Sequence, residues 1–308
     1  MASSVSTIST TVRSSAQALL LRTAFRIGAY VDPRDTLRAA GKLFSTPFRS
    51  SRDRAVSAPL GDAVCDSFAM GSHRIATYVW GDPARQPYVL FAHGWSSHGT
   101  RFLPWVARLR DAGYAVVAFD QPAHGRSSGE RTTLPDFAST LFVVARRFGP
   151  AAALVAHSLG GAAASVALAH GLEAERIVLI APAADPEAAT ERFARAIRLP
   201  QRLWRALIDS FERSVGVTFD DLQAHRNAPR IARPALIVHD LEDREVPWSE
   251  GERYARYWAG ARLLSTQGLG HNRIAGDAGV IDAAMRFLRG EAVGDRVVSS
   301  PNLPYGFA

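Results

Sequence analysis

The sequence has one cysteine, Cys65, among its 308 residues, and it has no long apolar run. A lone cysteine excludes an intramolecular disulfide and is compatible with a reducing compartment. A membrane-spanning helix needs about 20 consecutive apolar residues, which no stretch provides. His93 and His98 have no cysteine or carboxylate cluster beside them, so we expect no metal site. These absences favour a cytoplasmic protein, with a peripheral membrane contact left open.

Net positive charge is scarce outside the leading segment, although the whole chain carries a net charge of +7. Residues 1–54 hold nine basic and three acidic residues, a balance of +6, whereas the rest holds 27 and 26. The main part of the chain is therefore nearly neutral. It has no basic stripe with interleaved aromatic residues, which argues against nucleic-acid binding.

From residue 64 onward, short apolar runs alternate with amphipathic stretches. The runs predict strands at 64–70, 73–80, 87–92, 114–119, 151–157, 176–181, 234–239 and 261–266, and the stretches predict helices at 100–112, 134–148, 159–171, 249–258 and 277–289. This alternation predicts an α/β fold. We expect a mostly parallel central sheet of about eight strands, with helices on both faces and an antiparallel first pair.

The string AHSLG at residues 156–160 follows the apolar run 151–155 and precedes an alanine-rich stretch. A strand that ends in small-x-Ser-x-Gly and enters a helix is typical of a nucleophile elbow, a sharp turn that exposes the serine hydroxyl. Ser158 is the candidate nucleophile. The N–H of Leu159 would lie at the helix N-terminus, where an anion is favoured.

A serine nucleophile needs a base and a group that orients the base, in the chain order Ser, acid, His. The predicted strand 234–239 leads into a loop with three carboxylates. Asp243 is the first choice for the acid, Asp240 the second and Glu242 the third. His271 follows the strand 261–266 between glycines, so it is the candidate base.

With these residues the chain resembles the α/β-hydrolase superfamily, over roughly residues 60–290. The string FAHGW at 91–95 resembles the family's His-Gly-x oxyanion turn, so the N–H of Trp95 would join that of Leu159 as an oxyanion donor. Two further strings, at 119–127 and 239–247, resemble family turns, and the second places the acid on Asp243. The chain departs from the pattern at Ala156, where glycine is usual, and at Asp240.

The resemblance implies a serine hydrolase that cleaves a carboxylic ester through an acyl-enzyme, with no cofactor. We expect an uncharged or apolar small-molecule ester. The same chemistry would also serve a thioester, lactone, amide or carbon–carbon bond. A non-catalytic binding protein on this fold is the alternative from another class. The sequence leaves the oligomeric state open, and His93 and His124 are expected to brace their turns by hydrogen bonding.

The remaining segments suggest three parts: a basic N-terminal extension at 1–55, a hydrolase domain at 56–290 and a tail at 291–308. Residues 15–30 have helical spacing of apolar residues, and Pro33 and Pro47 are expected to break the segment. This helix could pack on the hydrolase core, contact a membrane or partner, or be a transit peptide. Residues 183–230 interrupt the strand alternation and by resemblance form a small helical cap.

Overall fold

The computed structural model describes the backbone of residues 2–297 and the side chains from residue 17 onward. Of the predicted tail, residues 298–308 lie outside the described residues. Residue 295 pairs with Leu263, at the edge of the sheet. The chain divides into two compact units, one of residues 46–185 and 220–308 and the other of residues 1–45 and 186–219.

The first unit contains one eight-stranded sheet with the order β1-β2-β4-β3-β5-β6-β7-β8. The strands are β1 (Val64–Met70), β2 (His73–Trp80), β3 (Tyr88–Ala92), β4 (Ala115–Phe119), β5 (Ala151–His157), β6 (Ala174–Ile180), β7 (Ala235–Asp240) and β8 (Arg262–Thr266). β1–β2 and β2–β4 pair antiparallel, and all later neighbours are parallel. All eight strands were predicted within about two residues, and the mostly parallel sheet is confirmed. Cys65 lies exposed on the edge strand β1.

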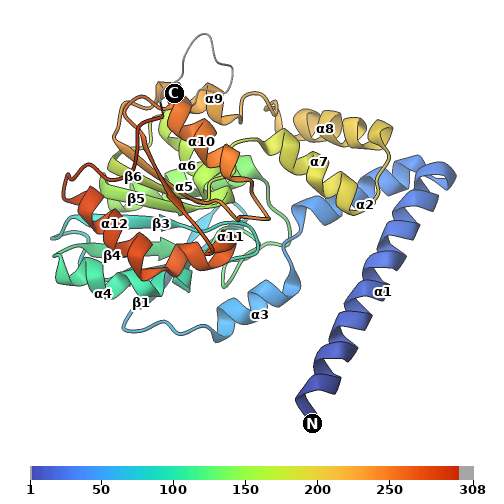
Figure 1. The fold of residues 1–308 in the computed structure, drawn as a ribbon, viewed down its shortest axis with the longest axis horizontal. Helices are drawn as coiled ribbons and strands as arrows, with labels where there is room; N and C mark the ends of the chain where they lie inside the picture. The colour runs from blue at the N-terminus through green and yellow to red at the C-terminus, as the bar shows by residue number, and fades with distance from the viewer. Residues whose placement is uncertain (1, 298–308) are drawn as a thin grey trace. The chain divides into compact units, whose positions relative to one another are not determined.

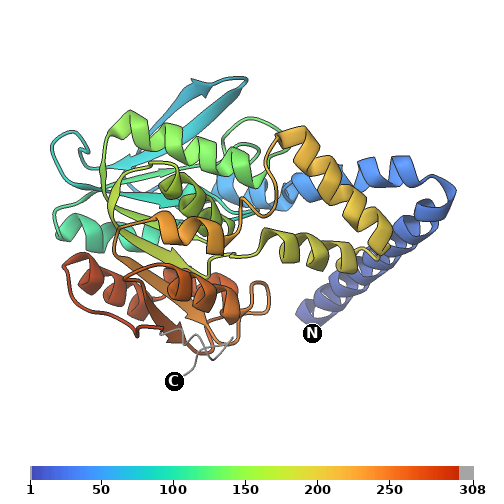
Figure 2. The same cartoon turned by 90° about the horizontal axis from the view of Figure 1, so that it is seen from above.

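Helices cover both faces of this sheet (Figures 1 and 2). On one face α4 (Leu103–Asp111) contacts α12 (Ala278–Leu288), and on the other α5 (Leu134–Phe148) contacts α6 (Leu159–Ala169), which is linked through α9 to α10 (Trp248–Tyr257). Shorter helical turns are η1 (Gly99–Phe102), α9 (Ala224–Asn227), η2 (Ala228–Arg230), α11 (Gly270–Arg273) and η3 (Ile274–Gly276), and α3 (Arg49–Ser57) precedes the sheet.

The central strands are hydrophobic on both faces because helices cover both. Every residue of β3 and β4 is buried. Val89 and Phe91 join the core under α4 and α12, whereas Leu90 between them points to the opposite face. The start of α5 is set locally, since Thr133 and Asp136 form a reciprocal capping box.

The second unit joins the N-terminal helices to the insertion. It contains α1 (Ala2–Val31), α2 (Pro33–Ser45), α7 (Pro186–Ala196) and α8 (Gln201–Val215). Its core is a cluster of side chains from all four helices and from the connection between α7 and α8, namely Phe25, Ala29, Ala40, Ala194, Ile197, Leu199, Leu203 and Leu207. The predicted insertion at 183–230 is therefore helical.

Two details of the N-terminal segment differ from the predictions. α1 begins at Ala2 rather than near residue 15. Pro33 ends α1 but also begins α2, because a proline is tolerated in the first turn of a helix, and the Asp32 carboxylate accepts a hydrogen bond from the N–H of Asp35 there. The buried side chains of α1 pack on α2 and the insertion helices. Among the described residues, no helix combines the length and apolar character that crossing a bilayer requires.

Candidate active site

The candidate residues follow the ends of four different parallel strands. Trp95 follows β3, Ser158 follows β5, Asp243 follows β7 and His271 follows β8. The carboxyl ends of parallel strands lie at one edge of a sheet, which is where ligands bind in open α/β sheets. The topology thus brings together residues that are more than 100 positions apart in the chain.

Ser158 lies in a sharp turn between β5 and α6. Its φ and ψ are 55° and −123°, a conformation that residues with a side chain rarely adopt. Small neighbours are required, because a Cβ at Gly160 would lie 2.5 Å from the His93 carbonyl oxygen and one at Gly94 would lie 2.8 Å from Ser158 Cβ. Ala156, where the family pattern has glycine, is fully buried and continues the pairing of β5 with β3. The turn therefore accepts alanine at that position.

A chain of two hydrogen bonds links the serine, the histidine and one aspartate. His271 Nε2 lies 2.9 Å from Ser158 Oγ, and His271 Nδ1 lies 2.7 Å from Asp243 Oδ2. A carboxylate only accepts hydrogen bonds, so Nδ1 carries the proton and Nε2 is free to accept from the serine hydroxyl. All three side chains are almost fully buried.

The Asp243 carboxylate accepts three hydrogen bonds and lies close to a second imidazole, whose Nε2 donates to the Val246 carbonyl. Oδ1 accepts hydrogen bonds from the N–H groups of Glu245 and Val246, each at 2.9 Å. Oδ2 faces His271 Nδ1 and also lies 3.4 Å from Nε2 of the buried His239. Burial by itself raises the pKa of Asp243, but the interactions with both imidazoles and the hydrogen bonds from the backbone outweigh it and hold the pKa well below its usual range. The group is therefore ionised and fixed in orientation.

The two alternative carboxylates have other partners. Asp240 Oδ1 accepts from the N–H of Glu242, and Asp240 Oδ2 accepts from Thr266 Oγ1 at 2.7 Å and from the N–H of Leu269 at 3.0 Å. Asp240 thus links the loop after β7 to the loop that carries His271. Glu242 accepts a hydrogen bond from Gln267 Nε2 at 3.3 Å. Of the three carboxylates, Asp243 is the one hydrogen-bonded to the imidazole.

Two N–H groups near Ser158 are available to a ligand. Leu159 is the first residue of α6, so its N–H has no partner within the helix. Neither this group nor the N–H of Trp95 donates to another protein atom in the described part of the chain. Trp95 lies in a turn that hydrogen bonds hold on both sides. The N–H of Ser96 donates to His124 Nε2 at 2.9 Å, and His93 Nδ1 donates to the Gly94 carbonyl at 2.7 Å.

The bracing role expected of His93 and His124 is confirmed. The second nitrogen of His93 accepts from the N–H of Gln121 at 3.0 Å, and that of His124 donates to the Pro122 carbonyl at 3.0 Å. Each ring thus uses one donor and one acceptor nitrogen, which requires the neutral form. Burial lowers the pKa of both side chains to about 3, so they are neutral at pH 7.

His157, the variable residue of the elbow, contacts the candidate base directly. Its Nε2 donates to the backbone carbonyl of His271 at 2.9 Å, and the two ring centroids are 4.9 Å apart. Burial lowers the pKa of His157 well below its usual value, so this second imidazole is neutral. The hydrogen bond of His157 to His271 and the contact of His239 with Asp243 were not predicted from the sequence.

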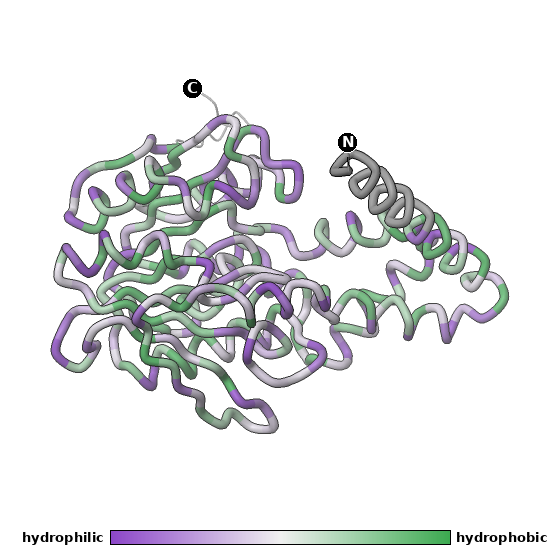
Figure 3. The backbone as a smooth tube through the Cα atoms, turned by 90° about the horizontal axis from the view of Figure 1, so that it is seen from below, coloured by the Kyte–Doolittle hydropathy of each residue, from purple (hydrophilic) through white to green (hydrophobic). Residues whose placement is uncertain are grey.

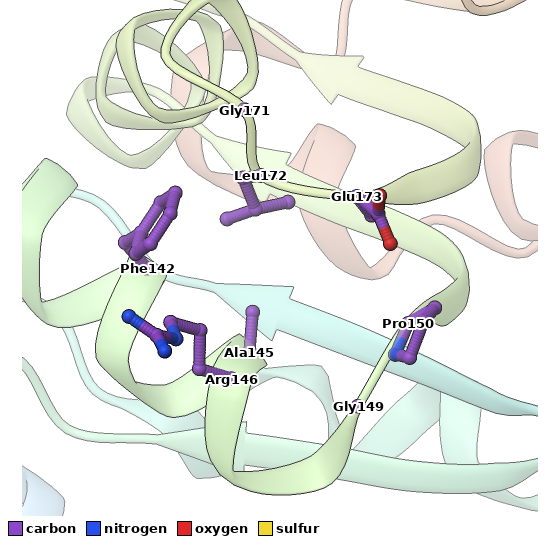
Figure 4. A pocket seen from close by; sticks show the side chains of 8 residues that line it. All are labelled: Phe142, Ala145, Arg146, Gly149, Pro150, Gly171, Leu172 and Glu173. Atoms are coloured by element: carbon purple, nitrogen blue, oxygen red, sulfur yellow. The ribbon is translucent and has the colours of Figure 1, made fainter.

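One concavity of the first unit reaches the candidate site, and another lies at the opposite edge of the sheet. A groove of about 350 Å³ runs between the loops after β7 and β8 and reaches His271, with Glu242, Arg244, Glu245 and Arg273 among its charged lining residues. The cavity in Figure 4, about 310 Å³, is bounded by Phe142, Arg146, Leu172 and Glu173 near the starts of β5 and β6, at the edge opposite Ser158. Within the described residues, no group of three or more histidine, cysteine or acidic side chains could hold a metal ion.

Comparison with known proteins places this architecture in a family. A family model described as alpha/beta hydrolase family matches residues 89–283. A monoacylglycerol lipase of Mycolicibacterium smegmatis is 28% identical over 250 residues, which cover 64% of this chain and 82% of the lipase. A pimeloyl-(acyl-carrier protein) methyl ester esterase of Xanthomonas oryzae pv. oryzae is 27% identical over 252 residues, 66% of this chain and 95% of the esterase.

The fold also matches solved structures. Alpha/beta hydrolase domain-containing protein 10 from mouse superposes with a TM-score of 0.57 at 19% identity, over 74% of this chain and 98% of the mouse protein. The family model spans the turn at Ser158, the loop that carries Asp243, and His271. It also covers β3 to β8 of the eight-stranded sheet. The chain belongs to the α/β-hydrolase family.

Proposed function

We propose that the protein is a serine hydrolase that cleaves carboxylic esters through a Ser158–His271–Asp243 triad. The observation that carries this proposal is the hydrogen-bonded chain from Ser158 Oγ through the imidazole to the Asp243 carboxylate, with distances of 2.9 and 2.7 Å. The names of the two relatives, a monoacylglycerol lipase and a methyl ester esterase, both describe enzymes of carboxylic esters and support the same class.

The proposed reaction has two steps. Ser158 Oγ attacks the ester carbonyl while His271 Nε2 takes the hydroxyl proton, and the imidazolium then gives that proton to the leaving alcohol. In the second step a water molecule attacks the acyl-enzyme carbonyl while His271 takes its proton. His271 then returns the proton to Ser158 Oγ, and the carboxylic acid is released. Asp243 keeps the proton on Nδ1 and stabilises the charged imidazole, since its carboxylate accepts from that nitrogen throughout.

The N–H groups of Trp95 and Leu159 would bind the oxyanion that develops on the carbonyl oxygen. Each such donor is worth about 3 kcal/mol in the transition state. The braced turn at His93 and His124 would hold the first donor, and the α6 N-terminus provides the second. The Trp95 ring lies 5.3 Å from that of His124, which is neutral, and 6.3 Å from that of Phe137, a surrounding without charge that favours an uncharged ester.

Labelling with a fluorophosphonate probe tests the proposal, because only an activated serine reacts with it. We expect labelling and p-nitrophenyl acetate turnover in the wild type, and loss of both in Ser158→Ala. Ser165→Ala is the matched control. Ser165 lies in the same helix and is buried, but it hydrogen-bonds the Ala162 carbonyl and Tyr254 rather than the imidazole. An unlabelled wild type, or a labelled Ser158→Ala, would contradict the proposal and favour the non-catalytic alternative.

A further inference from the structure

Helix α1 exposes a stripe of apolar side chains to solvent. Leu20, Ala24, Ile27 and Val31 follow one another at intervals of four, three and four residues, so they share one face of the helix. We call these four residues the outer face of α1. Leu20 is 70% exposed, Ile27 57% and Val31 78%. Large apolar side chains grouped in this way mark an interaction surface, whereas single ones need no explanation.

The opposite face of the same helix is already occupied. Phe25 and Ala29 are buried in the core of the second unit. Arg22 Nε donates to the carbonyl of Ala196, at the end of α7, which also ties this face to the insertion. In Figure 3 the part of α1 that follows its grey segment is largely coloured as hydrophobic. A helix that is apolar on both sides normally needs two partners, and this unit provides one.

The charge of the second unit indicates what the other partner is. Residues 1–45 and 186–219 contain 12 basic and six acidic residues, a net charge of +6, whereas the other unit contains 24 and 23, a net charge of +1. Arg26 and Arg34 are exposed on α1 and at the start of α2. A helix with an apolar face and with basic residues on its other side is typical of helices that lie in the headgroup region of an anionic bilayer.

We infer that the outer face of α1 binds the surface of an anionic lipid bilayer, with its apolar side chains inserted and the net positive charge of the second unit attracted to lipid phosphates. A second copy of the chain is the competing occupant. It fits less well, because pairing the two outer faces would bring together two units that each carry a net charge of +6. This inference does not rest on the proposed hydrolysis.

Co-sedimentation of the full chain with lipid vesicles tests whether the outer face of α1 binds an anionic bilayer. We compare vesicles of phosphatidylcholine with vesicles of two parts phosphatidylcholine and one part phosphatidylglycerol. The wild type should bind the anionic vesicles more tightly, by about fivefold for each arginine that reaches the surface, and added salt should weaken binding. The double variant Leu20→Glu/Ile27→Glu should lower the partition coefficient by at least about tenfold, since it removes two inserting side chains.

The matched control is Val56→Glu/Val64→Glu. These two valines are 54% and 67% exposed on α3 and β1, so this variant makes the same change of charge and apolarity outside α1. It should bind vesicles like the wild type. Both double variants should keep the wild-type Tm, because all four positions are exposed. Ser158→Ala should also bind normally, which separates this test from that of the proposed activity.

Three results would overturn the inference. The wild type could fail to bind anionic vesicles, or the α1 variant could bind as well as its control. Sedimentation velocity could instead show a dimer that Leu20→Glu/Ile27→Glu converts to a monomer, which would assign the outer face to a second copy of the chain.

Discussion

Asp243→Asn should abolish nearly all turnover, and the reason lies in the donors around the carboxylate. Oδ1 accepts from two backbone N–H groups, of Glu245 and Val246, at 2.9 Å each. In the variant, the amide oxygen must take that place, so the NH2 group faces His271 Nδ1. Nδ1 then has to accept, and the imidazole proton moves to Nε2, the nitrogen that faces Ser158 Oγ.

An imidazole in this tautomer cannot take the serine proton. A wrong tautomer costs a Ser-His-Asp site about 10⁴-fold in kcat, or about 5.5 kcal/mol in the activation free energy. The assay is steady-state p-nitrophenyl acetate hydrolysis over a range of substrate concentrations, together with thermal unfolding. We expect the fall in kcat with KM little changed, because the substitution acts through the base rather than on ground-state binding.

Asp240→Asn is the control that separates the two carboxylates. Both oxygens of Asp240 accept hydrogen bonds, from Glu242, Thr266 and Leu269, so an amide loses at least one of these bonds. We expect a loss of about 1–3 kcal/mol in the free energy of unfolding and a kcat within about tenfold of wild type. A larger fall in kcat for Asp240→Asn than for Asp243→Asn would refute the assignment of the acid.

Four further predictions concern pH, the elbow, the second imidazole and the helical unit. Burial raises the pKa of Asp243 and hydrogen bonds lower it, and the net shift is downward. The ionised carboxylate therefore contributes fully to the free energy of unfolding above about pH 4, and this contribution is lost as the pH falls through the lowered pKa of the folded state. Acid titration of Tm should therefore be flatter in Asp243→Asn. Gly94→Ala would place a Cβ 2.8 Å from Ser158 Cβ and should lower kcat/KM by about 10²-fold, whereas Gly276→Ala, whose Cβ meets nothing closer than 3.7 Å, should not. His157→Leu removes one hydrogen bond to the backbone carbonyl of His271 and should lower kcat about fivefold. Phe25→Ala should cost about 3–5 kcal/mol of packing in the helical unit and speed tryptic cleavage within α1. An unchanged cleavage rate would contradict that packing.

Much of the sheet domain could be predicted because its signals are local. Strands that helices cover on both faces are recognisable in the sequence as short continuous apolar runs, such as 88–92 and 115–119. The alternation of these strands with helices restricts the sheet to a few possible topologies. The elbow was equally visible, since the turn at Ser158 tolerates only small neighbours and those neighbours lie within two residues of it.

The sequence alone thus determined the fold class, the strands and the identity of the candidate nucleophile and base, because each depends on residues close together in the chain. The choice among Asp240, Glu242 and Asp243 was different. It depends on how a loop bends so that backbone N–H groups and two imidazoles surround one carboxylate, and residue spacing does not record that bend. Likewise, the partners of α1 lie more than 150 residues away, and only the tertiary structure showed that its buried face packs on the insertion helices.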